Sequence, residues 1–258
     1  MSTPHLVAAT LGHREIAHGF FGRQGGVSGG PFDSLNCALT TGDRPEDIAE
    51  NRRRAAATLG IAPANLVSTY QIHSADVVEV DEPWPLDARP KADAIVTRRP
   101  GIMLGILTAD CAPVLFADAE AGVIGAAHAG WRGAKLGIAD ATVAAMRKLG
   151  ADPARIEAVI GPCIAQASYE VGPEFPGPFL AEDPGNARFF RPGVREDRHM
   201  FDLGGYVAHR LTRLGLRSVE RLERDTCAEA DRFFSYRRTC LAGEKKFGCE
   251  LSAIAIRG

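Results

Sequence analysis

The sequence predicts an α/β fold with mixed sheets that forms a single domain over residues 1–258. Segments rich in β-branched residues alternate with helical patterns, without the strict strand–helix–strand rhythm of a doubly wound sheet. The chain has no internal repeat or linker, and its 45% hydrophobic and 24% charged residues are typical of a globular protein. Neither GxGxxG after a strand nor GxxxxGKS/T occurs, so nucleotide binding through these motifs has no support.

The N-terminal half combines a glycine-rich loop, one helix and several short strands. Residues 18–36 hold six glycines and few periodic apolar positions, which predicts a loop. The pattern of 45–60 predicts a helix, because Pro45 suits its first turn, acidic residues follow and Gly60 stands at its end. Runs of β-branched residues predict short strands at 66–70, 77–80, 94–97, 102–108, 114–117 and 123–128.

The C-terminal half alternates helices and strands. Apolar residues recur at helical spacing from Leu136 through Val143 to Met146, and Gly150 follows, so residues 134–150 are predicted to form one helix. A strand at 156–160, a helix at 202–216 and an alternating strand at 249–256 complete the pattern.

Composition and charge exclude several classes of function. A net charge of −2 at pH 7 and a pI near 6.4 lack the basic surplus of nucleic-acid binders. No apolar run reaches the ~18 residues of a membrane span, and the N-terminus lacks the basic-then-apolar layout of a secretory signal. We therefore expect a cytoplasmic protein without nucleic-acid or membrane partners, in an oligomeric state that the sequence leaves open. Its six scattered cysteines are expected to be reduced thiols.

A thiol and an imidazole stand out in the apolar stretch TADCAPVLFADAEAGVIGAAHAGWRG, residues 108–133. The turn signal at 118–122 predicts a hairpin that places Cys111 opposite His128 or Ala129. Directly opposed residues of an antiparallel pair have Cβ atoms ~5 Å apart. His73, between two strand-like runs, is the third member of this candidate set.

Two chemistries fit a set of His73, Cys111 and His128. In one, the three residues bind Zn²⁺ and leave a fourth position open to water or substrate, which is the arrangement of a catalytic zinc site. In the other, Cys111 is a thiolate nucleophile activated by His128, as in cysteine hydrolases. The spacing alone does not choose between them, and a lone cysteine in an apolar run is most often a packed core residue.

The residues directly after His128 point to anion binding. AGWRG lies where the strand ends and the helix predicted at 134–150 begins. Free N–H groups and the positive end of the helix dipole favour an anion there, and Arg132 would add a fixed charge. We therefore expect an oxyanion, phosphate above all, within reach of the metal. The alternative is that the glycines only allow a tight turn and that Trp131 caps the core.

Several motifs make the chain resemble the YfiH-like laccase-domain family. They are QIHS, ADAIVTRRPGIMLGILTADCAPVLFAD, AAHAGWRG, IGPCI followed by SYEVG, FDL and FFSYRR, in this order, and they span roughly residues 18–258. The resemblance implies a metal triad of His73, Cys111 and His128, and a layered α/β sandwich similar to the cysteine-hydrolase-like deamidase toxins. One departure is Ala228 in DTCAEA, where the family often has threonine, so a polar role at that position is in doubt.

The resemblance also implies contacts to substrate outside the triad. The family's Arg-x-Gly-Gly loop, its Ser-Leu-Asn and its Asn-Arg pair each have matching positions in this chain. We add Gln71, which stands beside His73. The implied substrate-binding residues are Arg23 with Gly25 and Gly26, Asn36, Asn51 with Arg52, and Gln71.

The activity implied by the family is phosphorolysis of purine nucleosides. Adenosine, inosine and methylthioadenosine react with phosphate to give the free base and ribose 1-phosphate, and adenosine is also deaminated to inosine. Zinc suits the deamination, because it lowers the pKa of bound water toward ~7. For phosphorolysis we expect Arg52, Arg132 and the helix N-terminus to hold phosphate, and Asp110 to protonate the departing base.

Three other functions stay open. One is a Cys111–His128 hydrolase or an editing factor for peptidoglycan precursors, a role also attached to bacterial members of the family. Another is a non-catalytic zinc-binding regulator, which three ligands disfavour because structural zinc normally has four. The third is a copper-binding polyphenol oxidase. Seven histidines are too few for several copper centres, although one set of two imidazoles and a thiolate could hold copper.

Overall fold

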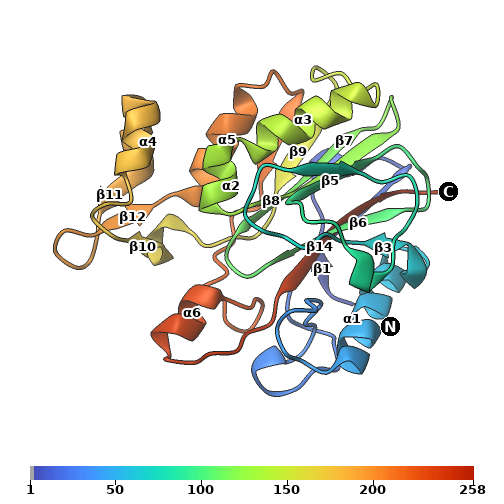
Figure 1. Cartoon of the computed structure of the whole chain (residues 1–258), viewed down its shortest axis with the longest axis horizontal. Helices are drawn as coiled ribbons and strands as arrows, with labels where there is room; N and C mark the ends of the chain where they lie inside the picture. Colours follow the sequence, from blue (N-terminus) through green and yellow to red (C-terminus); the bar gives the residue numbers. More distant parts are fainter. Residues whose placement is uncertain (1–2) are drawn as a thin grey trace.

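The computed structural model describes residues 3–258 and shows two β-sheets packed face to face between layers of helices (Figure 1). One sheet has the strand order β13-β9-β7-β8-β5-β4 and the other β1-β2-β14-β6-β3. Both contain parallel and antiparallel pairs, which confirms the predicted mixed sheets. The first sheet comprises β4 (Val77–Glu79), β5 (Ala94–Thr97), β7 (Ala112–Asp118), β8 (Val123–Ala129), β9 (Glu157–Ile160) and β13 (Ser218–Arg221). The second comprises β1 (His5–Leu6), β2 (Ile16–Phe21), β3 (Leu66–Val67), β6 (Met103–Thr108) and β14 (Glu250–Ile256).

The central strands are apolar on both faces because each sheet is covered on both sides. Along β6, Leu104 enters the core between the two sheets, whereas Met103 faces the helix on the outer side. Along β7, Leu115 enters the same inter-sheet core and Phe116 packs toward the helices on the other outer side. The alternation of side chains therefore builds three stacked cores.

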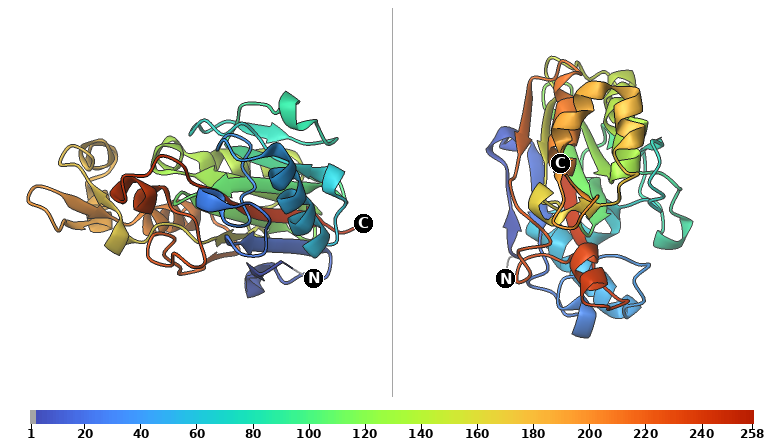
Figure 2. Two further views of the ribbon diagram at one scale, coloured as in Figure 1. Left: turned by 90° about the horizontal axis from the view of Figure 1, so that it is seen from below. Right: turned by 90° about the vertical axis from the view of Figure 1, so that its left-hand side faces the viewer.

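Helices cover the outer faces of the two sheets (Figure 2). α1 (Pro45–Thr58) places Ala55 and Ala56 against the five-stranded sheet. α3 (Ile138–Lys148) and α5 (Leu203–Thr212) pack on the six-stranded sheet through side chains such as Met146. No helix within residues 3–258 combines the length and the apolar character that crossing a membrane requires.

A smaller unit projects from one end of the sandwich (Figure 1). It contains a three-stranded sheet in the order β10-β12-β11 and the short helix α4. Aromatic side chains hold it together, with the rings of Phe190 and Phe201 stacked at 4.9 Å and Trp131 joining the cluster 5.0 Å from Phe175. Its elements are β10 (Glu170–Val171), α4 (Gly177–Glu182), β11 (Phe190–Pro192) and β12 (His199–Phe201).

The structure corrects three predictions of secondary structure. The helix predicted at 134–150 is two helices, α2 (Trp131–Leu136) and α3, because Gly137 adopts a left-handed φ of 92° between them. The loop predicted at 18–36 begins too early, because β2 continues to Phe21. This strand is buried on both faces, so its sequence does not alternate between apolar and polar residues. The strand predicted at 66–70 ends at Val67.

The other predicted elements are confirmed within a few residues. The predicted domain spans 1–258, and its first two residues lie outside the described range. Its likeness to cysteine hydrolases stays a prediction.

Candidate metal centre and its cavity

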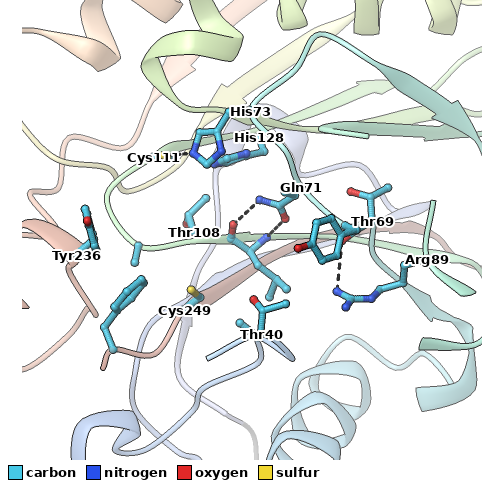
Figure 3. A pocket seen from close by; sticks show the side chains of 15 residues that line it. Thr40, Thr69, Gln71, His73, Arg89, Thr108, Cys111, His128, Tyr236 and Cys249 are labelled. Atoms are coloured by element: carbon cyan, nitrogen blue, oxygen red, sulfur yellow. Dashed lines mark hydrogen bonds between the residues drawn. The ribbon is translucent and has the colours of Figure 1, made fainter. Parts of the chain in front are cut away.

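A cavity of about 500 Å³ opens between the ends of the two sheets and the segment before β14 (Figure 3). In Figure 3 His73, Cys111 and His128 lie together on one side of it, and Thr40 and Arg89 lie on the other. None of its lining residues in the described chain is acidic. Besides the three candidate ligands, polar and aromatic residues of the lining are Thr40, Thr69, Tyr70, Gln71, Arg89, Thr108, Tyr236, Phe247 and Cys249.

The three predicted metal ligands meet in space. Their donor atoms all lie within 4.8 Å of one another, and Cys111 Sγ is 3.9 Å from His73 Nε2. The rings of His73 and His128 meet edge to face, with centroids 4.7 Å apart. Among residues 3–258 this is the one cluster of such side chains that could hold a metal ion.

The hairpin of β7 and β8 is confirmed, but its predicted register is wrong. Ala112 pairs with Ala129 and Pro113 pairs with His128, so Cys111 stands just before β7, level with Gly130. The turn lies later than expected, because Asp118 pairs with Val123 and its carboxylate accepts a hydrogen bond from Ala121 N. Cys111 and His128 are therefore diagonal neighbours, which share one face of the ladder.

A buried carboxylate, Asp93, positions two of the three ligands. It precedes β5 and is fully buried. Its Oδ1 accepts hydrogen bonds from His73 N at 2.9 Å and His128 Nδ1 at 2.8 Å. Its Oδ2 accepts from Ile72 N, Ser74 N and Ser74 Oγ. Because a carboxylate only accepts, His128 must carry its proton on Nδ1, which leaves the Nε2 lone pair for a metal or a thiol.

The backbone around the ligands is unusual in ways that the cluster requires. His73 adopts φ 61° and Asp110, directly before Cys111, adopts φ 85°. Left-handed conformations are uncommon for residues with a side chain, and they collect at functional sites. A Cβ at Gly130 would come within 2.9 Å of both Cys111 Sγ and the His73 ring. The glycine after Ala129 is therefore needed to let the thiol and the imidazole approach.

The charges of Asp93, Cys111 and His128 depend on one another. Burial alone would raise the pKa of Asp93, but hydrogen bonds from His128 and Ser74 lower it to about 2. Burial also disfavours the Cys111 thiolate, yet His128 and His73 lower the pKa of this thiol below its usual range. Burial disfavours the His128 imidazolium, but Cys111 and Asp93 raise its pKa. Without a metal the site favours a thiolate–imidazolium pair, and the same thiolate is the form that binds metal.

The donor set fits a single ion of zinc or copper. Bonds of about 2.1 Å to nitrogen and 2.3 Å to sulfur place two ligands of a tetrahedral ion roughly 3.5 Å apart. The 3.9 Å between Cys111 Sγ and His73 Nε2 is close to that separation. Imidazole and thiolate suit both metals. An ion held by these three residues at the wall of the cavity would be accessible to water or substrate.

Two other predicted residues lie beside the centre. Gln71 lines the cavity. Its side-chain amide forms hydrogen bonds with both the N–H and the carbonyl of Leu107, and these connect the His73 loop to β6. Asp110 is buried and does not line the cavity. Its carboxylate accepts hydrogen bonds from Thr226 Oγ1, Ser235 Oγ and Arg237 N. These contacts tie the Cys111 turn to the start of α6 (Tyr236–Leu241).

The structure does not bring Arg23, Asn36 or Arg52 to the cavity wall. Arg23 lines a neighbouring cavity and donates to the carbonyls of Asp33 and Ala230. Asn36 is fully buried. Its amide donates a hydrogen bond to Thr41 Oγ1 in the loop that follows and accepts one from Cys249 N. The guanidinium of Arg52 is buried below β3.

The structure does not bring Arg132, the cation of the predicted anion site, to the cavity. α2 has only six residues, and Arg132 is exposed beside Trp131, with its guanidinium carbon 5.4 Å from the ring centre. Arg132 does not line the cavity. Gly130 and Gly133 instead allow close packing, since a Cβ at Gly133 would meet Ser74 O at 2.9 Å.

Sequence reasoning missed several residues of the site. Asp93 stands directly before a fully buried strand. An acidic residue next to the apolar run in KADAIVT was the feature of the sequence that could have indicated its role. Arg89, Tyr70 and Phe247 come from irregular segments without periodic pattern, and Tyr236, whose ring is 5.1 Å from that of Phe247, begins the short helix α6. Tyr236 belongs to the family motif FFSYRR, but the motif alone did not indicate that this side chain faces the cavity.

Known proteins similar to this chain share both its sequence and its fold. The family model described as multi-copper polyphenol oxidoreductase laccase matches residues 17–257. The "Purine nucleoside phosphorylase ORF3" of Streptomyces griseus is 41% identical over 248 residues, which cover 94% of this chain and 96% of that protein. The "Purine nucleoside phosphorylase YfiH" of Escherichia coli K12 is 37% identical over 223 residues, which cover 86% of this chain and 88% of that protein.

Two solved structures have the same architecture. The Neisseria meningitidis protein NMB0706 superposes with a TM-score of 0.87 at 33% identity, over 98% of this chain and 99% of that one. YlmD from Geobacillus stearothermophilus superposes with a TM-score of 0.87 at 29% identity, over 97% of this chain and 94% of that one.

Proposed function

Because the chain belongs to the multi-copper polyphenol oxidoreductase laccase family, which includes the YfiH proteins, we propose that it is a zinc-dependent purine nucleoside phosphorylase. Its substrates are adenosine, inosine and methylthioadenosine with phosphate, and it also deaminates adenosine. The observation that carries the proposal is the cavity that contains His73, Cys111 and His128 at one side. The names of the two relatives described above support the reaction class.

The cavity has the properties of a site for a small planar ligand. Its volume of about 500 Å³ lies within the range of small-molecule sites. Tyr236, Phe247 and Tyr70 line it and offer aromatic faces for a purine. The absence of acidic residues among its described lining suits a reaction in which phosphate is a co-substrate.

The residues around the centre have separable roles. When bound, zinc supplies a Lewis acid and lowers the pKa of water, which is the chemistry that deamination needs. His73, Cys111 and His128 would bind the metal, and Asp93 orients the His128 imidazole through Nδ1 and fixes the His73 backbone through its N–H. In phosphorolysis a phosphate oxygen bonds to C1′ of the ribose while the bond from C1′ to the base breaks. The electron pair leaves with the base, which then takes up a proton.

We infer that Asp110 acts as a positioning residue. Its carboxylate already accepts three hydrogen bonds, and the cavity lining does not include it. The proton for the base therefore comes from another group, and these contacts do not support the role predicted for Asp110. For the same reason, the contacts of Arg23, Asn36, Arg52 and Arg132 support structural roles for them rather than direct contact with the nucleoside.

A second function has its own supporting observation. The thiol of Cys111 has a lowered pKa, and His128 and Asp93 complete a thiolate–imidazole–carboxylate chain. This arrangement suits a hydrolase in which Cys111 attacks an amide, including one in a peptidoglycan precursor. A metal on Cys111 would block that attack, so the two functions exclude each other at one time.

One assay separates the two functions. Purified protein is incubated with adenosine, with and without phosphate, and adenine, inosine and ribose 1-phosphate are quantified beside the metal content. We expect bound zinc, phosphate-dependent release of adenine, and inosine formation that needs no phosphate. Both reactions should be lost on chelation and in Cys111→Ala, and retained in Cys240→Ala, which removes an exposed thiol outside the cavity. Amide hydrolysis that survives complete chelation would overturn the zinc mechanism and support the thiolate.

A further inference from the structure

The side of the cavity opposite the metal ligands carries a positive charge that no neighbouring carboxylate neutralises. Arg89 lines this side, and in Figure 3 it lies well apart from His73 and Cys111. Its Nε donates to Leu86 O at 2.8 Å, and its Nη1 lies 3.5 Å from Thr69 O. Within residues 3–258 its guanidinium has no ion pair with an acid, and Nη2 has no acceptor. Main-chain contacts thus fix the orientation of the group and leave part of it available.

A buried hydroxyl beside this arginine also lacks a partner. Thr69 is 2% exposed and lines the cavity, and its Oγ1 has no hydrogen bond to any of the described residues. Thr40 places a second hydroxyl in the lining on the same side (Figure 3). A buried polar group without a partner costs about 1–3 kcal/mol, so such groups in native proteins are usually satisfied by a ligand or water.

A second arginine increases the positive potential behind this wall. Arg52 is buried, and its guanidinium has only long contacts of 3.3–3.4 Å, to Cys37 O, Leu66 O and Ser68 Oγ. None of these acceptors is charged, and Ser68 directly precedes Thr69. Burial, with a further contribution from the charge of Arg89, lowers the pKa of Arg52 to about 10, so it stays protonated at neutral pH. Two cations without a carboxylate create a field that favours a small anion.

We propose that Arg89, with the hydroxyls of Thr69 and Thr40, binds the inorganic phosphate that attacks the nucleoside, and that Arg52 supports this subsite from behind. The inference rests on the proposed phosphorylase function and identifies where its co-substrate lies. An attacking phosphate and a departing base occupy opposite faces of C1′. Phosphate on the Arg89 side therefore directs the base toward the opposite wall of the cavity. Arg89 offsets the charge of the phosphate.

Steady-state kinetics with phosphate and adenosine varied separately test the subsite. Arg89→Gln should raise the KM for phosphate by about 10-fold or more, the effect of losing a charged hydrogen bond, and leave the KM for adenosine within about twofold. Thr69→Val, which removes only the hydroxyl, should raise the phosphate KM by about threefold to tenfold. Arg89→Lys should restore part of the loss. Arg147→Gln, at an exposed arginine of α3 outside the cavity, should change neither constant.

Calorimetric titration of inorganic phosphate into the zinc-loaded protein, without nucleoside, gives a readout that does not need turnover. We expect binding that weakens in Arg89→Gln and Thr69→Val by the same factors as the KM. An unchanged phosphate KM and unchanged binding in both variants, with phosphorolysis intact, would overturn this subsite and leave the proposed function standing. Phosphate binding that depends on Arg89 in a protein that never phosphorolyses nucleosides would support the subsite and overturn the proposed function.

Discussion

Asp93 and Glu250 are buried carboxyl groups at the start of two strands, and they differ in the hydrogen bonds that they accept. Asp93, before β5, accepts five hydrogen bonds, and its pKa is lowered to about 2. Glu250, the first residue of β14, is 4% exposed, and neither of its oxygens has a hydrogen bond of normal geometry to the described residues. Burial raises the pKa of Glu250 well above its usual range. Burial is common to both, so donor groups decide which acid carries a charge.

The difference matters because only the charged acid touches the metal centre. An ionised Asp93 fixes the tautomer of His128 and the backbone of His73, and it stabilises positive charge on the ligand side of the cavity. Within residues 3–258 the Glu250 carboxyl has no hydrogen bond of normal geometry, so it orients none of the three candidate ligands. The comparison therefore predicts different consequences when each carboxyl is replaced by its amide.

The largest expected effect is that of Asp93→Asn. The amide nitrogen cannot accept a hydrogen bond, so either the donors of His73 and His128 or those of Ile72 and Ser74 lose their partner. We expect zinc affinity to fall about 10- to 100-fold, with a matching loss of adenosine turnover at limiting zinc, measured by competition with a chromophoric chelator. Asp76→Asn, at an exposed acid in the same part of the chain, serves as the control and should bind zinc normally. Full zinc affinity in Asp93→Asn would show that the carboxylate is not needed to orient the ligands.

A second prediction compares two cysteines of one cavity. Cys111 and Cys249 both line it, but the pKa of Cys111 is lowered by its imidazoles and the pKa of Cys249 is raised by burial. In metal-free protein at pH 7.5, iodoacetamide should alkylate Cys111 at least about tenfold faster than Cys249, because the thiolate is the nucleophile. Peptide mass spectrometry measures both rates, and zinc should protect Cys111 alone. Equal rates in the metal-free protein would contradict the assigned ionisation.

The smallest effect on the candidate site is that of Glu250→Gln, which changes the stability of the protein instead. The folded-state pKa of Glu250 lies above its unfolded value of 4.5, so below pH 4.5 both states bind the proton and the carboxyl has no pH-dependent effect. As pH rises above 4.5 the unfolded state ionises first, and the wild type loses about 1.4 kcal/mol per pH unit until the folded carboxyl also ionises. The glutamine variant has no such loss, so its relative stability should increase from pH 5 to pH 8 in urea titrations. A difference between the two proteins that stays constant over this range would mean that Glu250 is already ionised when folded.

The sequence was most informative where structure is local. The strand predicted at 94–97 has these bounds in β5, and the helix predicted at 45–60 ends two residues earlier as α1. Prediction failed at the end of β2, where Gly19 and Gly22 favoured a loop, and at Gly137, where one glycine with positive φ interrupts a helical pattern. The composition of a segment indicates a loop or a helix, and the backbone conformation of a single glycine is not visible in it.

The same limit applies to the site. The hairpin of β7 and β8 brings Cys111 near His128 because only a short turn separates them, and the approximate position of this pair followed from the turn signal. Arg132 was expected at the cavity because it follows His128, but the direction of its side chain depends on α2, which turns it to solvent. Asp93 was missed because its partners are 19 to 35 residues away.

The sequence by itself determined the alternation of strands and helices, the β7–β8 hairpin and the three candidate metal ligands. Only the tertiary structure decided which polar side chains share the cavity with them: Asp93 behind the imidazoles, Arg89 and Thr69 on the opposite side, and Tyr236 with Phe247 at a third wall. The physical reason is that hydrophobic periodicity acts over one or two turns of chain, whereas the cavity forms where segments near residues 40, 70, 89, 110, 128 and 247 converge. No local pattern encodes that convergence, because packing of the two sheets determines it.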